Sequence, residues 1–349
     1  MFELSSDACR CRPRGRRGRP AGAGCRRSRR RLLGSLLLSV LAAVHSIHAA
    51  AVSPLSPTAI VAAPDGKSLY VALATATAVA VVNDHGVVQR RIALPGAPSG
   101  LALSPDGTQL AVTCAAPQSV VCLVDIAGGK VLARMGAGHT AMAPVFSRDG
   151  ATLYVCNRYH NEIAVFDVKA RRRLGPIAVE REPVAAALHR DGRLLFVANH
   201  LPAMAADAPQ VSAAISVIDT AARRIVKTLS LPNGSNLVLG IAVSPDGRYA
   251  AVTHNLARFY VPTTQVERGW MNTAALTLID AVQLQVINTV LLDNLESGGG
   301  ESVGRWVDGG RPEPAGDACR HARVERHRFP GGLRQAGAAA GRARPWAGA

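Results

Sequence analysis

The sequence predicts an all-β protein made of repeated four-stranded units, and three observations support this prediction. A tight-turn signature ending in Asp-Gly recurs with steps of 41, 43, 42 and 55 residues between its aspartates. A short apolar strand pattern follows each signature, and a second strand pattern that ends at an acidic residue comes after it. Regular spacing of this kind is typical of repeat architectures. The turn aspartates are Asp65, Asp106, Asp149, Asp191 and Asp246.

The second repeat illustrates how the elements follow one another. Ser104-Pro-Asp-Gly supplies a fixed φ and a glycine that tolerates positive φ, so the chain reverses between two antiparallel strands. Strands are expected at 100–104 and 110–113 around this turn, then at 123–125 and 130–134, because β-branched residues prefer a pleated surface. Four strands in about 40 residues, repeated around an axis, predict a β-propeller. The fourth and fifth repeats are longer because of insertions near 201–213 and 258–272.

The repeats resemble a known family. Leu153-Tyr-Val-Cys-Asn, followed by a Val-x-Val-x-Asp type strand and preceded by Ser-Pro-Asp-Gly type turns, is similar to the YVTN family of β-propeller repeats over residues 54 to about 295. The resemblance implies a secreted, periplasmic or surface propeller, commonly of seven blades. Similar blades occur in lactonase-like propellers and in propellers fused to c-type haem modules. This chain departs from the pattern at Leu73, Cys114 and His254, where the family has Asn.

The chain divides into four predicted segments. Residues 1–31 form a basic leader, 32–51 hold an apolar run and a small-residue cleavage site, 52–298 carry the repeats, and 299–349 are a tail rich in Gly, Arg, Ala and Pro. The apolar run is too short to span a bilayer, which takes about 20 residues, and it follows paired arginines. We therefore expect export to the periplasm or secretion, through either an ordinary secretory or a twin-arginine signal.

The tail has two interpretations. One is a disordered basic segment. The other is a frameshift near residue 298, because codons allowed for residues 300–330, read one base later, can encode another repeat with an Ala-Asp-Gly turn. On the second interpretation the in-frame chain is a propeller of about five blades with an incomplete ring, which would expose two sheet faces and lower its solubility.

The charge distribution argues against a nucleic-acid partner. The net charge of +16 resides mainly in the two ends, whereas residues 32–298 hold 20 basic and 17 acidic residues. A phosphate-binding surface needs Lys and Arg gathered on one folded face. The expected partner is instead a protein or a small molecule.

Candidate binding residues follow the second strand of the last three repeats, where loops of neighbouring blades converge at one end of a ring. Asn and His at these places bond their own backbone in turns, so a structural role and a binding role both fit. The two insertions hold aromatic residues and arginines, which are enriched at protein interfaces. The candidates are Asn157, Arg158, Tyr159, His160, Asn199, His200, His254 and Asn255, with Arg258, Tyr260, Arg268 and Trp270 from the second insertion.

The leading hypothesis is a non-enzymatic exported β-propeller that binds through the loops of its fourth and fifth blades. No catalytic residue, metal ligand set or cofactor is predicted, since nucleophile-elbow, phosphate-loop and zinc-protease motifs are absent from the sequence. The alternatives are the propeller part of a periplasmic redox enzyme with a lost haem module, and a lactonase-like propeller. Cys114 and Cys122 lie on neighbouring predicted strands, where either a disulfide or two buried thiols fit.

Overall fold

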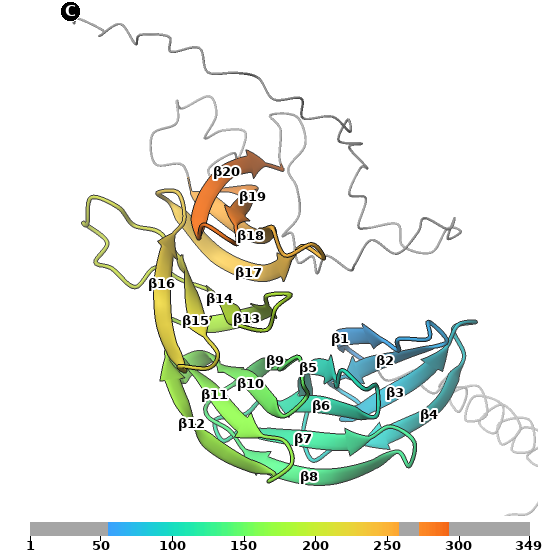
Figure 1. Cartoon of the computed structure of the whole chain (residues 1–349). Coiled ribbons are helices and arrows are strands. Elements are labelled where there is room, and N and C mark those ends of the chain that lie inside the picture. The colour runs from blue at the N-terminus through green and yellow to red at the C-terminus, as the bar shows by residue number, and fades with distance from the viewer. Residues whose placement is uncertain (1–54, 258–271, 293–349) are drawn as a thin grey trace, which may run out of the picture.

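The described residues form five four-stranded antiparallel sheets (Figure 1). The computed structural model describes residues 55–257 and 272–292. Within each sheet the strands lie in sequence order, so every connection is a hairpin. The one helical element in these ranges is a 3-10 turn, Arg158–His160. The predicted all-β fold of four-stranded units is confirmed.

We call the sheets blades one to five in chain order. Blade one comprises β1 (Pro57–Ala62), β2 (Ser68–Leu73), β3 (Ala78–Asn83) and β4 (Val88–Ala93), and blade two comprises β5 (Pro98–Leu103), β6 (Gln109–Cys114), β7 (Val120–Asp125) and β8 (Lys130–Gly136). Blade three comprises β9 (Ala141–Phe146), β10 (Thr152–Asn157), β11 (Glu162–Asp167) and β12 (Arg172–Ala178). Blade four comprises β13 (Pro183–Leu188), β14 (Leu194–Asn199), β15 (Ala214–Asp219) and β16 (Arg224–Ser230), and blade five comprises β17 (Ser235–Val243), β18 (Tyr249–Ala257), β19 (Asn272–Asp280) and β20 (Gln285–Leu291).

The Asp-Gly signature makes the turn between the first two strands of every blade. Its glycine takes a positive φ in all five cases, between +69° and +78°, a conformation that other residues adopt only with strain. The preceding aspartate accepts a hydrogen bond from the backbone N–H two residues later, at 2.9 to 3.1 Å. Repetition of the same contacts in every blade shows that these aspartates build turns.

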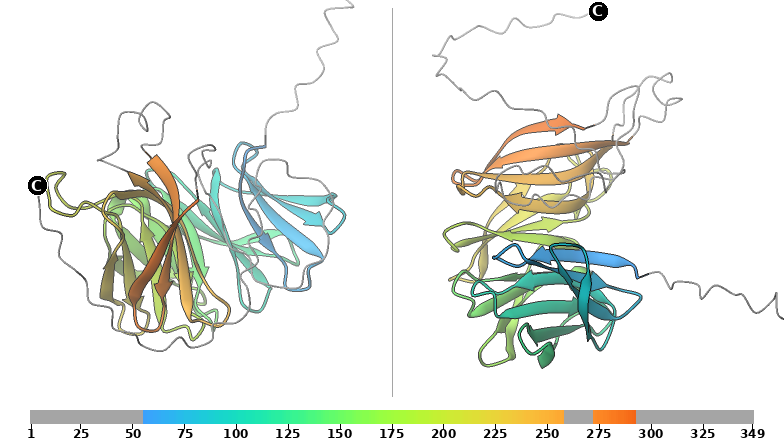
Figure 2. Two further views of the ribbon diagram at one scale, coloured as in Figure 1. Left: turned by 90° about the horizontal axis from the view of Figure 1, so that it is seen from above. Right: turned by 90° about the vertical axis from the view of Figure 1, so that its right-hand side faces the viewer.

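The blades are arranged radially along an arc (Figure 1). The first strand of each blade, from β1 to β17, contacts the first strand of the next blade, so these strands line the inside of the arc and the fourth strands lie outermost. Blades one and five stand apart in each view (Figures 1 and 2). One end of the arc carries the Asp-Gly turns, and we call it the Asp-Gly rim. The opposite end, where the second strands finish, is the Asn rim.

Apolar side chains from two successive blades form each of the four cores. The core between blades three and four, for example, joins Tyr154, Cys156 and Ile163 to Leu195 and Val197. In blades one to four, one side chain near the end of the outermost strand also enters the core shared with the next blade. These residues are Ile92, Met135, Ile177 and Leu229. Stability therefore depends on contacts between neighbours along the arc.

The segments predicted as leader (1–31), signal (32–51) and tail (299–349) lie outside the described residues. Within the described ranges, no helix has the length and apolar character needed to cross a membrane.

Candidate functional site

The polar stretch after β10 lies at the Asn rim, beside the joint between blades two and three. Asn157 is fully buried, and its Nδ2 donates a hydrogen bond of 2.6 Å to Glu162 Oε1, which also accepts one of 2.5 Å from Arg173. Gly138 of blade two packs against this group, since a Cβ there would lie 2.5 Å from both Asn157 Nδ2 and His160 Nδ1. Asn157 is therefore held between two blades and is not free to rotate toward solvent.

The next residues connect blade three to blade four and present rings to solvent. Arg158 contacts Glu182 through two nitrogens at 2.9 and 3.0 Å. Tyr159 is 51% exposed and makes an edge-to-face contact with His139, with ring centroids 5.0 Å apart. His160 also lies near His139, with ring centroids 6.3 Å apart. The exposed part of this stretch is thus a small aromatic surface that is supported by a partly buried ion pair.

Asn199 and His200 are buried in blade four. Asn199 Nδ2 donates to Ala214 O at 2.8 Å and to Ser216 Oγ at 3.0 Å. His200 reaches blade five, because its Nδ1 lies 2.9 Å from Val238 O and the Val238 N–H donates to His200 O at 3.1 Å. His200 therefore fastens the start of the first insertion to β17.

His254 and Asn255 lie in β18. His254 is 2% exposed, and burial lowers the pKa of its imidazole, which favours the neutral ring. Its Nε2 lies 2.8 Å from Thr277 Oγ1, which is 2.7 Å from Thr289 Oγ1. Asn255 is half-buried in the extended sheet opposite Asn236. The other four candidates, Arg258, Tyr260, Arg268 and Trp270, lie outside the described residues.

His160, His200 and His254 have separate polar partners: the His139 N–H, Val238 O and Thr277 Oγ1. In the ranges the structure describes, no three His, Cys, Asp or Glu side chains are grouped so that they could hold a metal ion.

Buried polar groups without partners gather at the Asn rim. Within the described residues, five buried side-chain oxygens have no hydrogen-bond partner, and three of them belong to blade five. Nearly all buried polar groups in proteins find a partner, often an internal water, so these positions are unusual. The atoms are Asn157 Oδ1, Asn199 Oδ1, Ser235 Oγ, Thr253 Oγ1 and Thr273 Oγ1.

A cavity of about 520 Å³ lies inside the arc and opens toward the Asp-Gly rim. The first strands of all five blades line it, with Leu101, Val145 and Ile241 among the apolar wall residues. Arg148 and Arg190 stand at its mouth, where blades one, two and five carry proline in the turn. This cavity was not predicted from the sequence, although the replacement of Pro by Arg in two successive turns is a signal that could have identified it.

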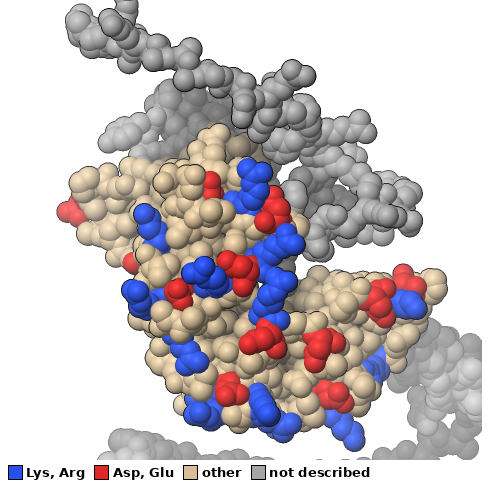
Figure 3. Space-filling model, in the orientation of Figure 1, with Lys and Arg blue, Asp and Glu red and all other residues tan. Residues whose placement is uncertain are grey.

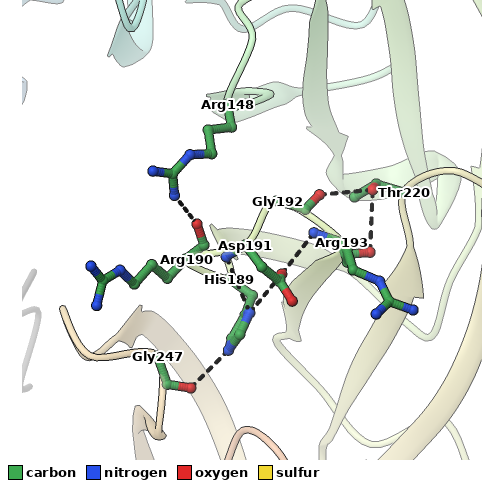
Figure 4. Close-up of polar contacts among 8 residues, drawn as sticks. All are labelled: Arg148, His189, Arg190, Asp191, Gly192, Arg193, Thr220 and Gly247. Atoms are coloured by element: carbon green, nitrogen blue, oxygen red, sulfur yellow. Dashed lines mark hydrogen bonds and ion pairs between the residues drawn. The ribbon is translucent and has the colours of Figure 1, made fainter.

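His189 occupies the centre of a polar cluster at this mouth (Figure 4). Its Nδ1 lies 2.7 Å from Asp191 Oδ1, and its Nε2 lies 2.7 Å from Gly247 O in the turn of blade five. Arg148 Nη1 donates to Arg190 O, which ties blade three to blade four. Three other turns have serine two residues before the aspartate, namely Ser104, Ser147 and Ser244. In blade four His189 takes this position, and its ring bridges blades four and five. This cluster too was not predicted from the sequence.

The pKa values of the turn aspartates Asp106, Asp149, Asp191 and Asp246 are lowered, which favours their ionised form. Hydrogen bonds from the Ser104 hydroxyl and from Thr108 hold the pKa of Asp106 below its ordinary value. The Ser147 hydroxyl does the same for the pKa of Asp149. Burial raises the pKa of Asp191, but the hydrogen bonds with the Arg193 amide and the His189 ring lower it by more than burial raises it. Its pKa therefore lies below the ordinary value. A carboxylate with a lowered pKa is a poor proton donor at neutral pH.

The three described cysteines are free and buried. Cys114 and Cys122 lie in the core between blades one and two, and the hydrogen bond between their sulfurs lowers the pKa of Cys114 and raises that of Cys122. The sequence allowed either a disulfide or two buried thiols at these positions, and the structure has two buried thiols. Burial raises the pKa of Cys156 to about 12. A thiol with so high a pKa is unreactive at neutral pH.

Charged side chains are mixed by sign on the face shown in Figure 3. Asp and Glu lie among the Lys and Arg side chains there, and the basic side chains form no more than a short row near the middle of this face.

Comparisons with known proteins agree on the architecture. A family model described as "Lactonase, 7-bladed beta-propeller" matches residues 130–202. A solved structure of hydrazine synthase from Kuenenia stuttgartiensis matches with a TM-score of 0.64 and 25% identity, over 71% of this chain and 70% of that chain. The chain is a β-propeller protein. The propeller is also 29% identical to the hydrazine synthase subunit beta of the same organism. The matched region has 98 residues, or 28% of this chain. That match spans a quarter (25%) of the subunit.

Proposed function

We propose that this protein is an exported, non-catalytic β-propeller that binds a protein or small molecule at the Asn rim of blades four and five. One observation carries the proposal. The insertion 201–213 is clamped to blade five at both ends, just before its start through His200 and Val238, and at its end through Ala213 N–H to Ser235 O at 2.8 Å. Binding loops of this kind sit on rigid scaffolds, and clamping lowers the entropy that is lost on binding.

The shape of blade five supports the same location. Strands β17, β18 and β19 have nine residues each, whereas the first three strands of the other blades have six. The extra residues of β18 extend beyond the position of His254, so blade five stands higher than its neighbours at the Asn rim. A raised edge beside the clamped insertion suits a binding surface.

Shortening the insertion tests the proposal. Deletion of residues 203–208 keeps the anchors His200, Gln210 and Val211 and removes the projecting part of the loop. We expect the immobilised variant to capture several-fold less of its partner from a periplasmic extract than the parent chain. Its melting temperature should stay close to that of the parent, because shortening an exposed loop changes stability little.

The matched control lies at the opposite rim. Lys67→Ala with Asp84→Ala changes two exposed residues of blade one and should leave capture unchanged. Equal capture by the parent and the deletion variant would place the binding surface elsewhere.

A lactonase is the second candidate, because the lactonase family model covers Arg148 and His189 at the cavity mouth and Asp191, which contacts His189. A histidine beside a carboxylate is an arrangement used for general-base catalysis. Against this role, His189 Nε2 already faces Gly247 O at 2.7 Å, so the nitrogen that would meet a substrate is engaged. A pH-stat assay on five- and six-membered lactones decides the matter. Lactone hydrolysis by the parent chain that His189→Ala abolishes would establish lactonase activity. If the parent chain hydrolyses none of the lactones, the lactonase hypothesis is wrong.

If the chain is a YVTN-type propeller interrupted by a frameshift near residue 298, a further alternative is that it is the propeller part of a periplasmic redox enzyme whose haem module was lost. The similarity to hydrazine synthase supports this redox alternative. The nucleotide sequence beyond codon 296 discriminates between the hypotheses. A Cys-x-x-Cys-His motif in the shifted frame would favour a redox enzyme, and a stop soon after two more repeats would favour the binding scaffold.

A further inference from the structure

The outermost strand of blade five differs in charge from the outermost strand of every other blade. β20 has the sequence Gln-Val-Ile-Asn-Thr-Val-Leu and carries no charged residue. Each of β4, β8, β12 and β16 carries two Lys or Arg residues within the strand. Charged residues on edge strands, Lys above all, prevent strands of different molecules from pairing. β20 lacks this protection.

β20 is also an exposed edge. It lies at the end of its sheet, paired on one side with β19 and, in the part of the chain that the structure describes, with no strand on the other (Figure 1). Its apolar side chains are exposed on both faces, from Val286 (36%) and Ile287 (49%) to Val290 (53%). An uncharged, proline-free segment rich in β-branched residues is the kind that adds to another sheet.

The charge pattern favours a second copy of this chain as the partner. Two identical strands such as β12 or β16 would place like charges together, which opposes their pairing. Two copies of β20 bring no charges together. An antiparallel pair of identical strands is related by a two-fold axis and uses the same surface on both copies.

We propose that two copies of this chain pair through antiparallel β20 strands, which joins two fifth blades into one eight-stranded sheet. With the two-fold axis at Asn288, Val286 of one copy lies opposite Val290 of the other, and Ile287 lies opposite Thr289. Cross-strand pairs of β-branched residues stabilise such a sheet. This surface is separate from the Asn-rim site, so it stands independently of the proposed function.

Sedimentation velocity over a concentration series tests the pairing. Gln285→Arg with Asn288→Lys places charges where β16 has Arg224 and Lys227, and both positions are exposed. The parent chain should sediment as a concentration-dependent dimer, and this variant as a monomer with an unchanged melting temperature. The control Gln89→Arg with Gln118→Lys adds the same charge at exposed residues away from β20 and should stay dimeric. If the parent chain precipitates, only the β20 variant should restore solubility.

A cross-link locates the contact. In a chain with Cys9, Cys11, Cys25 and Cys319 replaced by Ser, Asn288→Cys should give a disulfide-linked dimer on mild oxidation, which the same chain with Asn288 should not give. A monomeric parent at its highest soluble concentration would overturn the proposal. So would a β20 variant that associates like the control, or the absence of the Asn288→Cys cross-link.

Discussion

Gly138 shows how one residue decides what the polar stretch after β10 can do. The small residue allows Asn157 and His160 to approach the backbone of blade two, and a Cβ at Gly138 would meet both side chains at 2.5 Å. Asn157 is consequently a structural contact between blades, while Tyr159 remains available at the surface. A structural role and a binding role thus belong to different residues of the same short stretch.

We expect Gly138→Ala to destabilise the protein by about 1 to 3 kcal/mol, because the added methyl displaces packed side chains. Gly136→Ala is the matched control, since a Cβ there meets no atom within 4 Å. Urea unfolding of the two variants gives the comparison. Equal stability of both would mean that the Asn157 side chain moves aside without cost.

At the scale of the element, the outermost strands contribute one apolar anchor each to the following blade. Ile92, Met135, Ile177 and Leu229 are 4% to 6% exposed. Val290 is the corresponding residue of β20, and it is 53% exposed. The same place in the repeat is thus core in four blades and surface in the fifth, because the described residues include no blade beyond it.

This difference predicts unequal effects of the same truncation. Ile177→Ala should lower the free energy of unfolding by about 2 to 5 kcal/mol, as is usual when a buried aliphatic side chain is removed. Made in the Gln285→Arg, Asn288→Lys variant, in which no second copy covers β20, Val290→Ala should change it by no more than about 0.5 kcal/mol, as is usual at the surface. Thermal or urea unfolding measures both. A large loss from Val290→Ala would reveal a core at β20 that the described structure does not contain.

For the whole molecule, stability should fall from the middle of the arc toward its ends. In a linear array each blade is supported only by its neighbours, and the two end blades have one neighbour each. Leu69 and Val71 of blade one are only half-buried, whereas Leu153 and Val155, at the same places in blade three, are fully buried.

Hydrogen exchange measures this gradient. Backbone amides of blades two to four should exchange more slowly than those of blades one and five. The measurement is best made on the Gln285→Arg, Asn288→Lys variant, in which β20 is not protected by a second copy. Uniform protection across all five blades would indicate a ring that closes in solution.

The sequence by itself determined the blades. Asp-Gly turns at regular steps with strand patterns between them require no distant contact to form, so the five four-stranded sheets could be predicted from local chemistry. The candidate site was only partly accessible in this way. Asn157, Asn199 and His254 occupy equivalent places along the chain, yet their partners, Glu162, Ser216 and Thr277, come from the next strand of the blade.

Only the tertiary structure decided which polar residues are scaffold and which face solvent. The inner cavity, the bridge from His189 to the next blade and the exposure of Val290 all arise where separate blades meet or fail to meet. Such contacts join residues that are one repeat or more apart. A repeat specifies its own sheet through near neighbours, whereas burial at a joint depends on what the adjacent blade places against it.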